Sequence, residues 1–215
     1  MFLCLQEPGG KMGERVKIQP SDVVIMCSKS GKLTSSLVRY RCEKCLPPSV
    51  DKQCLLLSDS YSEQNDTEIY QNIPSKSIQR IMIPKNTTCD IQPLDRYFNR
   101  QMKILIKRLY HHVAIEKIDI NLWKRNNIVK LISLVHNQLS SSKFNKMIQY
   151  SWYCSGYSKV NPSPFQNVEV CFPPTASIEL CEKKRALKQA SLPVPFVRRN
   201  FLSIISLFNI IFIER

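Results

Sequence analysis

The chain has 215 residues, a length that fits one domain with an extension or two small domains. With 43% hydrophobic and 22% charged residues it can bury a core, which excludes wholesale disorder. Thirteen prolines against five glycines exclude collagen-like and flexible-linker compositions. The formal net charge of +14 is typical of a chain that meets a polyanion, most often nucleic acid.

The positive charge is unevenly placed along the chain. Residues 1–95 carry 12 basic and 11 acidic side chains, whereas residues 96–215 carry 19 basic and 6 acidic ones. One interpretation is a generally basic surface. We favour the other, a polyanion-binding C-terminal part beside a nearly neutral, acid-bearing N-terminal part.

The nine cysteines are odd in number and irregularly spaced, which favours reduced intracellular thiols over a disulfide framework. Cys42 and Cys45 form one CxxC pair, but no second pair follows at a zinc-ribbon distance and the three histidines do not complete a ligand set. We therefore expect buried thiols rather than a structural zinc site.

The two ends of the chain are apolar but short. Residues 1–5 lack the charged segment that opens a secretory signal. Residues 201–213 are apolar over 13 positions, whereas a membrane-spanning helix needs about 20. We expect this tail to be a buried or aggregation-prone segment, and we expect no membrane partner.

The pattern of the first 112 residues alternates between strands and helices. Apolar or alternating runs around glycines at 1–5 and 15–19 predict a hairpin. Further runs predict strands at 22–27, 54–58 and 78–83, helices at 34–45 and 94–111, and a weak helical pattern at 62–73. Such alternation is typical of an α/β domain.

The helix after Pro93 is the most clearly marked element. Proline suits its first position because the missing N–H has no partner inside the helix there. Its apolar stripe consists of Phe98, Met102, Leu105, Ile106 and Leu109, with basic residues on the other faces. We expect its aromatic residues to lie in the core rather than to stack on bases: Tyr97, Phe98 and Tyr110.

Beyond this helix we predict two more, at 121–139 and 143–154, and a basic, loosely ordered segment at 183–199. We therefore divide the chain into an α/β domain over 1–112, a helical extension over 113–182, and a basic then apolar tail over 183–215.

Two aspartates occupy positions where chemistry gathers in open α/β sheets. Asp59 directly follows an apolar strand, and Asp95 lies in the first turn of the helix after the next strand. Two carboxylates held there can share divalent cations. The competing interpretation is structural: an acid in the first turn complements the helix dipole, and an aspartate after a strand often serves a turn. We expect a structural role for Glu63, Asp66 and Glu68, on a solvated face or at a helix start.

The residues around the two aspartates resemble a known family. The segment 83–95, IPKNTTCDIQPLD, resembles the PxNTT…QPLD signature of pogo/Tigger-like transposases, which belong to the mariner-related DDE/DDD superfamily. The resemblance implies that Asp95 is the third catalytic carboxylate, and that Asp59, within LLLSDS at 55–60, is the second. Weaker similarity to the family covers about residues 1–172, including 28–32, 123–127, 136–138 and 150–153.

The resemblance implies a partial ribonuclease-H-like fold, a mixed sheet with flanking helices, followed by the helical extension. It also implies Mg²⁺ or Mn²⁺ bound by Asp59 and Asp95. The first catalytic aspartate of the family lies on an upstream strand, whereas this chain has no aspartate before residue 14 and offers only Glu7 and Glu14. Glu7 precedes Pro8 and two glycines, where we do not expect a central strand. We therefore expect a family member truncated at its N-terminus.

Two functions follow. The first is a transposase-derived, endonuclease-like protein whose ancestor cleaved and joined DNA by a two-metal mechanism. We expect this truncated form to be inactive, and whether it is still an enzyme stays open. The alternative is a non-catalytic basic protein, derived from a transposon, that binds DNA or another partner. We expect DNA as partner and a nuclear location, with the cytoplasm as the alternative. The candidate DNA-binding residues are Arg96, Arg100, Lys103, Lys107, Arg108, Lys124 and Arg125.

Overall fold

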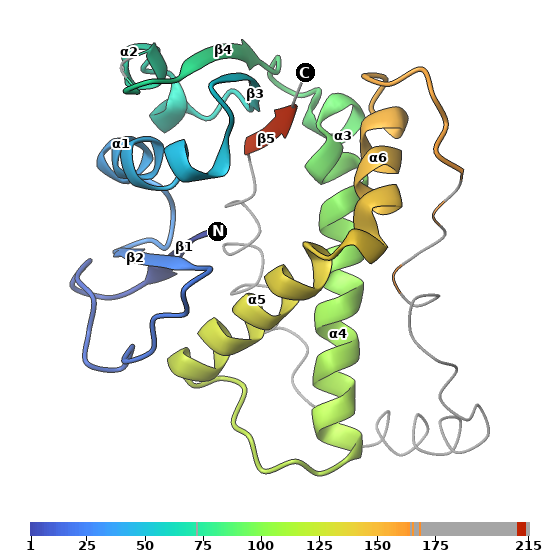
Figure 1. The fold of residues 1–215 in the computed structure, drawn as a ribbon. Helices are drawn as coiled ribbons and strands as arrows, with labels where there is room; N and C mark the ends of the chain where they lie inside the picture. The colour runs from blue at the N-terminus through green and yellow to red at the C-terminus, as the bar shows by residue number, and fades with distance from the viewer. Residues whose placement is uncertain (72, 164, 166–167, 169–209, 214–215) are drawn as a thin grey trace.

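The computed structural model describes residues 1–71, 73–163, 165, 168 and 210–213. The described chain is a mixed α/β structure with two small sheets (Figure 1). In the first sheet, β1 (Phe2–Gln6) pairs in parallel with β2 (Val24–Ser28). The second sheet has the strand order β4-β3-β5, with β4 parallel and β5 antiparallel to β3. Its strands are β3 (Gln53–Ser58), β4 (Ser77–Met82) and β5 (Ile210–Ile213).

The helices account for most of the remaining described chain. They are α1 (Ser35–Lys44), α2 (Glu68–Gln71), α3 (Thr88–Ile91), the π-helical turn η3 (Leu94–Phe98), α4 (Asn99–Ile115), α5 (Arg125–Leu139) and α6 (Asn145–Cys154). Short 3₁₀ turns are η1 (Pro47–Ser49), η2 (Ser62–Gln64) and η4 (Ser142–Phe144).

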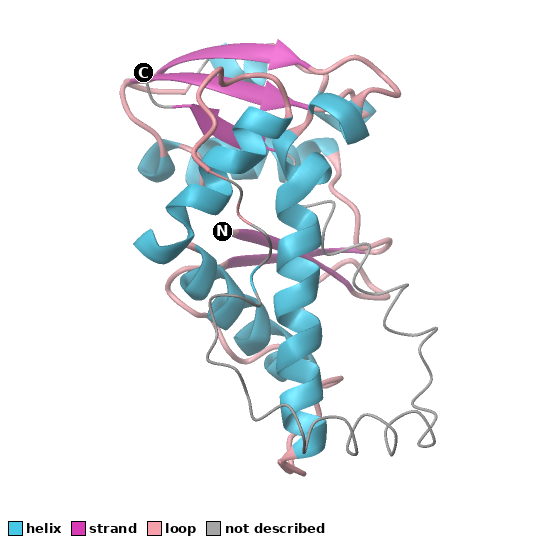
Figure 2. Cartoon of the chain, turned by 90° about the vertical axis from the view of Figure 1, so that its right-hand side faces the viewer, coloured by secondary structure: helices cyan, strands magenta, loops and turns pink. Residues whose placement is uncertain are grey.

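The long helix α4 organises the arrangement of these elements. The three-stranded sheet lies at one end of α4, and the two-stranded sheet is level with its middle (Figure 2). Helix α5 crosses α4 and leads back to α6 (Figure 1). The strands β1 and β2 bury their apolar residues in one core with α1, α4 and α5, and its most buried members include Leu3, Val38, Leu105 and Val129. The aromatic residues of the η3–α4 helix pack against this core, as expected.

The predicted hairpin between residues 1–5 and 15–19 is wrong. No strand forms at 15–19; instead β1 lies parallel to β2, in a register that runs from Phe2 opposite Val24 to Gln6 opposite Ser28. The 15–19 segment bonds elsewhere, since the Lys17 backbone N–H donates to Asn126 Oδ1 at 2.9 Å. β1 therefore pairs in parallel with β2, instead of pairing with the 15–19 segment across a local turn.

The other elements predicted for residues 1–112 form close to their expected positions. The strands predicted at 22–27, 54–58 and 78–83 are β2, β3 and β4, and the helices predicted at 34–45 and 94–111 are α1 and η3–α4. The weak helical pattern at 62–73 yields only η2 and the four-residue α2. The two later helices begin after their predicted starts, α5 at Arg125 and α6 at Asn145.

The seven cysteines in the described ranges are free thiols, and Cys42 is fully buried. Within the same ranges, no helix combines the length and apolar character needed to cross a membrane. Part of the apolar tail forms β5, while its remainder at 201–209 and the basic segment 183–199 lie outside the described residues.

Candidate functional site

Asp59 lies where β3 ends. The strand finishes at Ser58, which is fully buried, and the next residue turns the chain away from the sheet. The carboxylate supports this turn, because the Tyr61 backbone N–H donates to Asp59 Oδ1 at 3.3 Å. Asp59 itself is partly buried, so its side chain borders both the core and the surface.

Asp95 lies in the first turn of η3 and is exposed. The turn begins after Pro93, and the Arg96 backbone N–H donates to the Gln92 carbonyl at 2.8 Å. The Asn99 side chain, on the next turn, donates to Asp95 Oδ1 at 2.8 Å and fixes the carboxylate on one side. Asn99 is almost fully buried, so its amide holds Asp95 from the core side of the helix.

The charge of Asp95 affects the Asp59 carboxyl. Burial raises the pKa of Asp59, and the negative charge of Asp95 raises it further. The Tyr61 hydrogen bond and the nearby guanidinium groups of Arg41 and Arg80 act in the opposite direction. The charge of Asp95, at the start of η3, therefore acts on the Asp59 carboxyl at the end of β3.

This carboxylate pair is a poor ligand set for paired divalent ions. Among the described residues, no cluster of three or more Asp, Glu, His or Cys side chains could hold a metal ion. Mg²⁺ binds through carboxylates in a near-ideal octahedral arrangement, and two-metal catalysis requires side chains that hold both ions at a fixed separation. Asp59 and Asp95 alone do not provide that arrangement.

Glu7 directly follows β1, yet it lies in a structural ion-pair cluster. Its side chain is almost fully buried and lies 2.6 Å from Arg15 Nη2 and 3.2 Å from Arg125 Nε. Arg125 also donates to the Gln6 carbonyl at 2.8 Å. Because its guanidinium is engaged by these groups, we leave Arg125 out of the DNA-contacting set.

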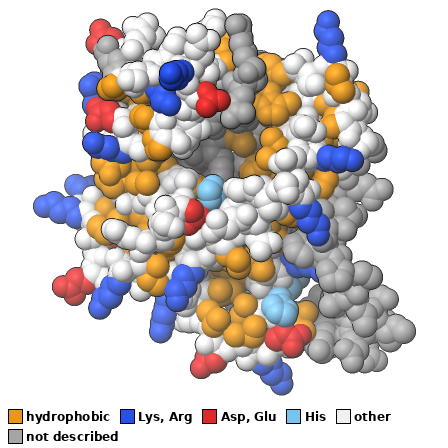
Figure 3. Space-filling model, in the orientation of Figure 1, with side chains coloured by type: hydrophobic (Ala, Val, Ile, Leu, Met, Phe, Trp, Pro, Cys, Tyr) orange, Lys and Arg blue, Asp and Glu red, His pale blue; other side chains and the backbone are white. Residues whose placement is uncertain are grey.

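Four of the predicted DNA-binding residues form one stripe along η3 and α4. Arg96, Arg100, Lys103 and Lys107 are all exposed, and their spacing of four, three and four residues places them on one helix face. Arg96 Nη1 also lies 3.7 Å from Asp90 Oδ1, but both side chains of this ion pair are exposed, so Arg96 stays in the set. Lys124 is exposed in the linker before α5, and Arg108 is only partly exposed. On the face shown in Figure 3, Lys and Arg side chains are spread among hydrophobic ones, so we define this basic stripe by the helix spacing.

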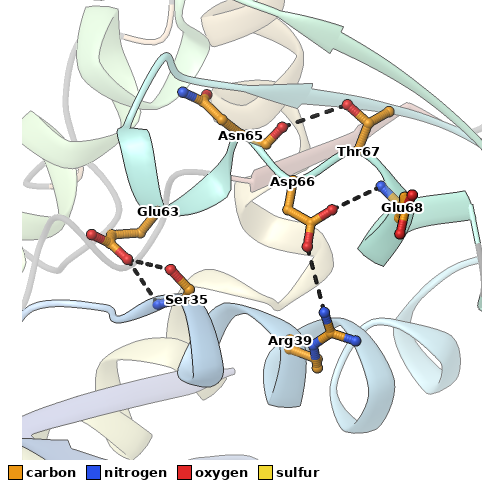
Figure 4. A network of polar contacts seen from close by, with 7 residues as sticks. All are labelled: Ser35, Arg39, Glu63, Asn65, Asp66, Thr67 and Glu68. Atoms are coloured by element: carbon orange, nitrogen blue, oxygen red, sulfur yellow. Dashed lines mark hydrogen bonds and ion pairs between the residues drawn. The ribbon is translucent and has the colours of Figure 1, made fainter.

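The acids expected to have structural roles join α1 to the η2–α2 segment, as Figure 4 shows. Glu63 accepts hydrogen bonds from the backbone N–H, at 2.9 Å, and the hydroxyl of Ser35 at the start of α1. Asp66 accepts from Arg39 at 3.4 Å and from the Glu68 backbone N–H at 3.1 Å. These contacts cap helix starts and confirm the structural interpretation of Glu63 and Asp66.

Comparison with known families identifies the chain. The family described as DDE superfamily endonuclease matches residues 7–155, more than half of the sequence. Searches of curated proteins and of solved structures gave no match. The matched range contains Asp59, Asp95 and the basic stripe. The chain belongs to the DDE superfamily endonucleases.

Proposed function

We propose that this chain is a transposase-derived protein, of the pogo/Tigger type, that binds duplex DNA along the basic stripe and does not cleave it. The family implies a DNA substrate. We further propose that residues 1–112 descend from a ribonuclease-H-like domain, and that the protein acts in the nucleus.

The proposal of DNA binding rests on the position of the basic stripe relative to Asp95. Arg96 directly follows Asp95, and Lys107 lies eleven residues further along the helix. At a rise of 1.5 Å per residue the stripe is about 16 Å long. Phosphates of one DNA strand rise about 3.4 Å per nucleotide along the duplex axis, so the stripe matches about five of them. DNA bound along it leads toward the Asp59–Asp95 pair.

The absence of cleavage follows from the ligand set. The resemblance implies an ancestral two-metal mechanism with Mg²⁺ or Mn²⁺. Since the carboxylate pair does not fit two ions, we derive no cleavage step for this chain. In this proposal, the DNA backbone approaches the three-stranded sheet next to Asp59 and Asp95.

A salt-dependent binding experiment tests the DNA interface. The four stripe residues are changed to Gln in one variant, and the exposed Lys11, Lys29, Lys44 and Lys52 are changed to Gln in a control with the same change in net charge. Fluorescence anisotropy on a duplex of arbitrary sequence gives the slope of log affinity against log salt. This slope is negative, and we expect it to become shallower by about 0.9 for each phosphate that the stripe variant no longer neutralises, and to change little in the control. Equal effects of both variants would show that only net charge matters.

The alternative function is a non-catalytic interaction protein. The apolar residues exposed around the α4–α5 linker favour it: Ile118, Ile120 and Leu134 are 39%, 47% and 45% exposed. Absence of DNA binding by the wild type, at low salt, would support this alternative over the proposed function.

A further inference from the structure

A groove lies between the second half of α4, the first turns of α5 and the linker 116–124 that joins them. We call it the α4–α5 groove. Its volume is about 570 Å³, within the range of about 300–1,000 Å³ that binding sites occupy. Two of its apolar lining residues, Ile120 and Leu134, are exposed, so the groove is open to solvent. Exposed apolar surface of this kind marks an interaction site.

The two long walls of the groove are helix faces. Leu109 and Val113 line it from α4, four residues apart, and Asn127, Leu131 and Leu134 line it from α5. Spacings of three, four and seven residues bring side chains to the same side of a helix. A groove between two such faces receives a third, amphipathic helix, whose ridges of side chains pack between those of the walls.

Hydrogen bonds hold the linker in place at the end of the groove. The Ile118 backbone N–H donates to the Val113 carbonyl of α4 at 3.0 Å. The Asn127 side chain, on α5, donates to the Asn121 carbonyl at 2.8 Å. The linker residue Ile120 adds to the apolar lining between these two attachments. A groove that is already formed lowers the entropic cost of binding a partner.

The charged side chains of the groove are unevenly placed. Lys124 and Lys130 line it from the start of α5, and Asp119 is the only acid among its described lining residues. All three are exposed, and within the described ranges none of them forms an ion pair. Figure 3 shows hydrophobic side chains gathered low on the face, where α4, α5 and the linker meet in Figure 1, with charged side chains beside them.

This charge distribution selects among the possible occupants. A basic lining on a chain of net charge +14 favours an acidic partner and disfavours a second copy of this chain. Nucleic acid is disfavoured as well, because apolar walls do not neutralise phosphates.

We propose that the α4–α5 groove docks an amphipathic helix of a partner protein. The apolar residues of that helix, at i, i+3 or i+4 and i+7, pack into the groove, and acidic residues on one flank face Lys124 and Lys130. The proposal goes beyond DNA binding and does not rest on it, because none of the four residues of the basic stripe lines the groove.

The test selects a peptide on the full 215-residue chain, without DNA. The probe is a displayed library of amphipathic helices of about 18 residues, or about five turns. Their apolar positions vary among Leu, Ile and Phe, and their flanking positions vary among Glu, Gln and Lys. The tightest peptide is synthesised with a fluorescent label, and anisotropy gives its Kd for the wild type and for each variant.

Two variants change the groove. Leu134→Asp places a charge in the α5 wall at an exposed position, and Lys124→Glu/Lys130→Glu reverses the charge of the α5 side. Lys44→Glu/Lys52→Glu makes the same change in net charge at exposed positions outside the groove and is the matched control. A second peptide, with Lys in place of the acidic flank, is the probe for the charge-reversed variant.

We expect selection to enrich Glu on one flank, and the Kd to rise about tenfold in both groove variants and to change little in the control. The Lys-flanked peptide should recover affinity for the charge-reversed variant. No selected binder, a Kd unchanged in a Leu134→Asp protein that circular dichroism shows to be folded, or an equal loss in the control would overturn the proposal. So would lost peptide binding in the four-Gln stripe variant, which would place the peptide on the DNA-binding surface.

Discussion

Asp22 and His136 are 114 positions apart in the chain, yet Asp22 Oδ2 lies 3.0 Å from His136 Nδ1. The Ser133 hydroxyl donates to the other oxygen of the same carboxylate at 2.7 Å. Asp22 precedes β2, whereas both partners lie on α5. The segment after residue 112 is thus joined to the N-terminal strands by hydrogen bonds as well as by a shared core. The domain boundary near residue 112 stays a prediction.

The Asp22 contacts predict a stability that depends on pH. Burial favours a higher pKa for Asp22, but the hydrogen bonds from Ser133 and His136 outweigh it and the pKa is lowered. An acid with a lowered pKa in the folded state stabilises the fold above its unfolded value of 3.8, and this stability is lost as pH falls through the folded pKa. We expect Asp22→Asn to lose about 1–2 kcal/mol of unfolding free energy at pH 7 and clearly less at pH 2.

Urea denaturation of Asp22→Asn at the two pH values checks this prediction. The exposed Asp119, changed to Asn, is the matched control and should leave stability unchanged at both. A loss in Asp22→Asn of the same size at pH 2 and pH 7 would show that the charge of the carboxylate is irrelevant.

A second prediction concerns the buried carboxylate of Glu7. Changing it to Gln removes the charge that faces Arg15 and Arg125 while keeping the shape of the side chain. Removing one partner of a buried ion pair costs about 3–5 kcal/mol; because Arg15 is 63% exposed, we expect the lower end of this range. Glu14→Gln, at an exposed position, should change stability by less than about 0.5 kcal/mol. Equal stability of the two variants in denaturant unfolding would contradict a structural role for Glu7.

Asp59 gives a prediction of the opposite sign. Burial, followed by the charge of Asp95, raises its pKa. For an acid whose pKa is raised by folding, the stabilising contribution exists at low pH and is lost as pH rises through the folded value. Asp59→Asn should therefore raise the melting temperature at pH 7 and have little effect at pH 3. Asn can still accept the Tyr61 N–H, so the turn is preserved. A lower melting temperature at pH 7 would mean that the charged carboxylate stabilises the fold.

Local patterns predicted the elements whose signals are contained in short segments. The apolar run at 54–57 and the proline at 93 marked β3 and the start of η3 because burial and backbone geometry act on neighbouring residues. The hairpin failed because 15–19 alternates like a strand but is held by the side chain of Asn126, more than a hundred residues away. Long-range partners leave no signal in a local pattern.

The residues of the candidate site were also only partly predictable from the sequence. The motif at 83–95 directed attention to Asp95, and the strand end to Asp59, from sequence alone. Arg41 and Arg80 had no such signal, because an arginine on a helix or an edge strand is normally exposed. Only the fold shows that Arg41 is buried and that Arg80 bonds to Ser58, the residue before Asp59. Arg125 was predicted as a DNA contact because its charge is visible in the sequence, whereas its contacts with Glu7 and Gln6 are not.

The central claim is the proposal that this chain binds DNA and that Asp59 and Asp95 do not support its cleavage. The most direct test is a supercoiled-plasmid nicking assay, in Mg²⁺ and in Mn²⁺, with the wild type beside Asp95→Asn at concentrations where both bind DNA. We predict no nicking above background by either protein, because two carboxylates do not hold two ions across a phosphate. Robust nicking by the wild type that is abolished in Asp95→Asn would contradict the account.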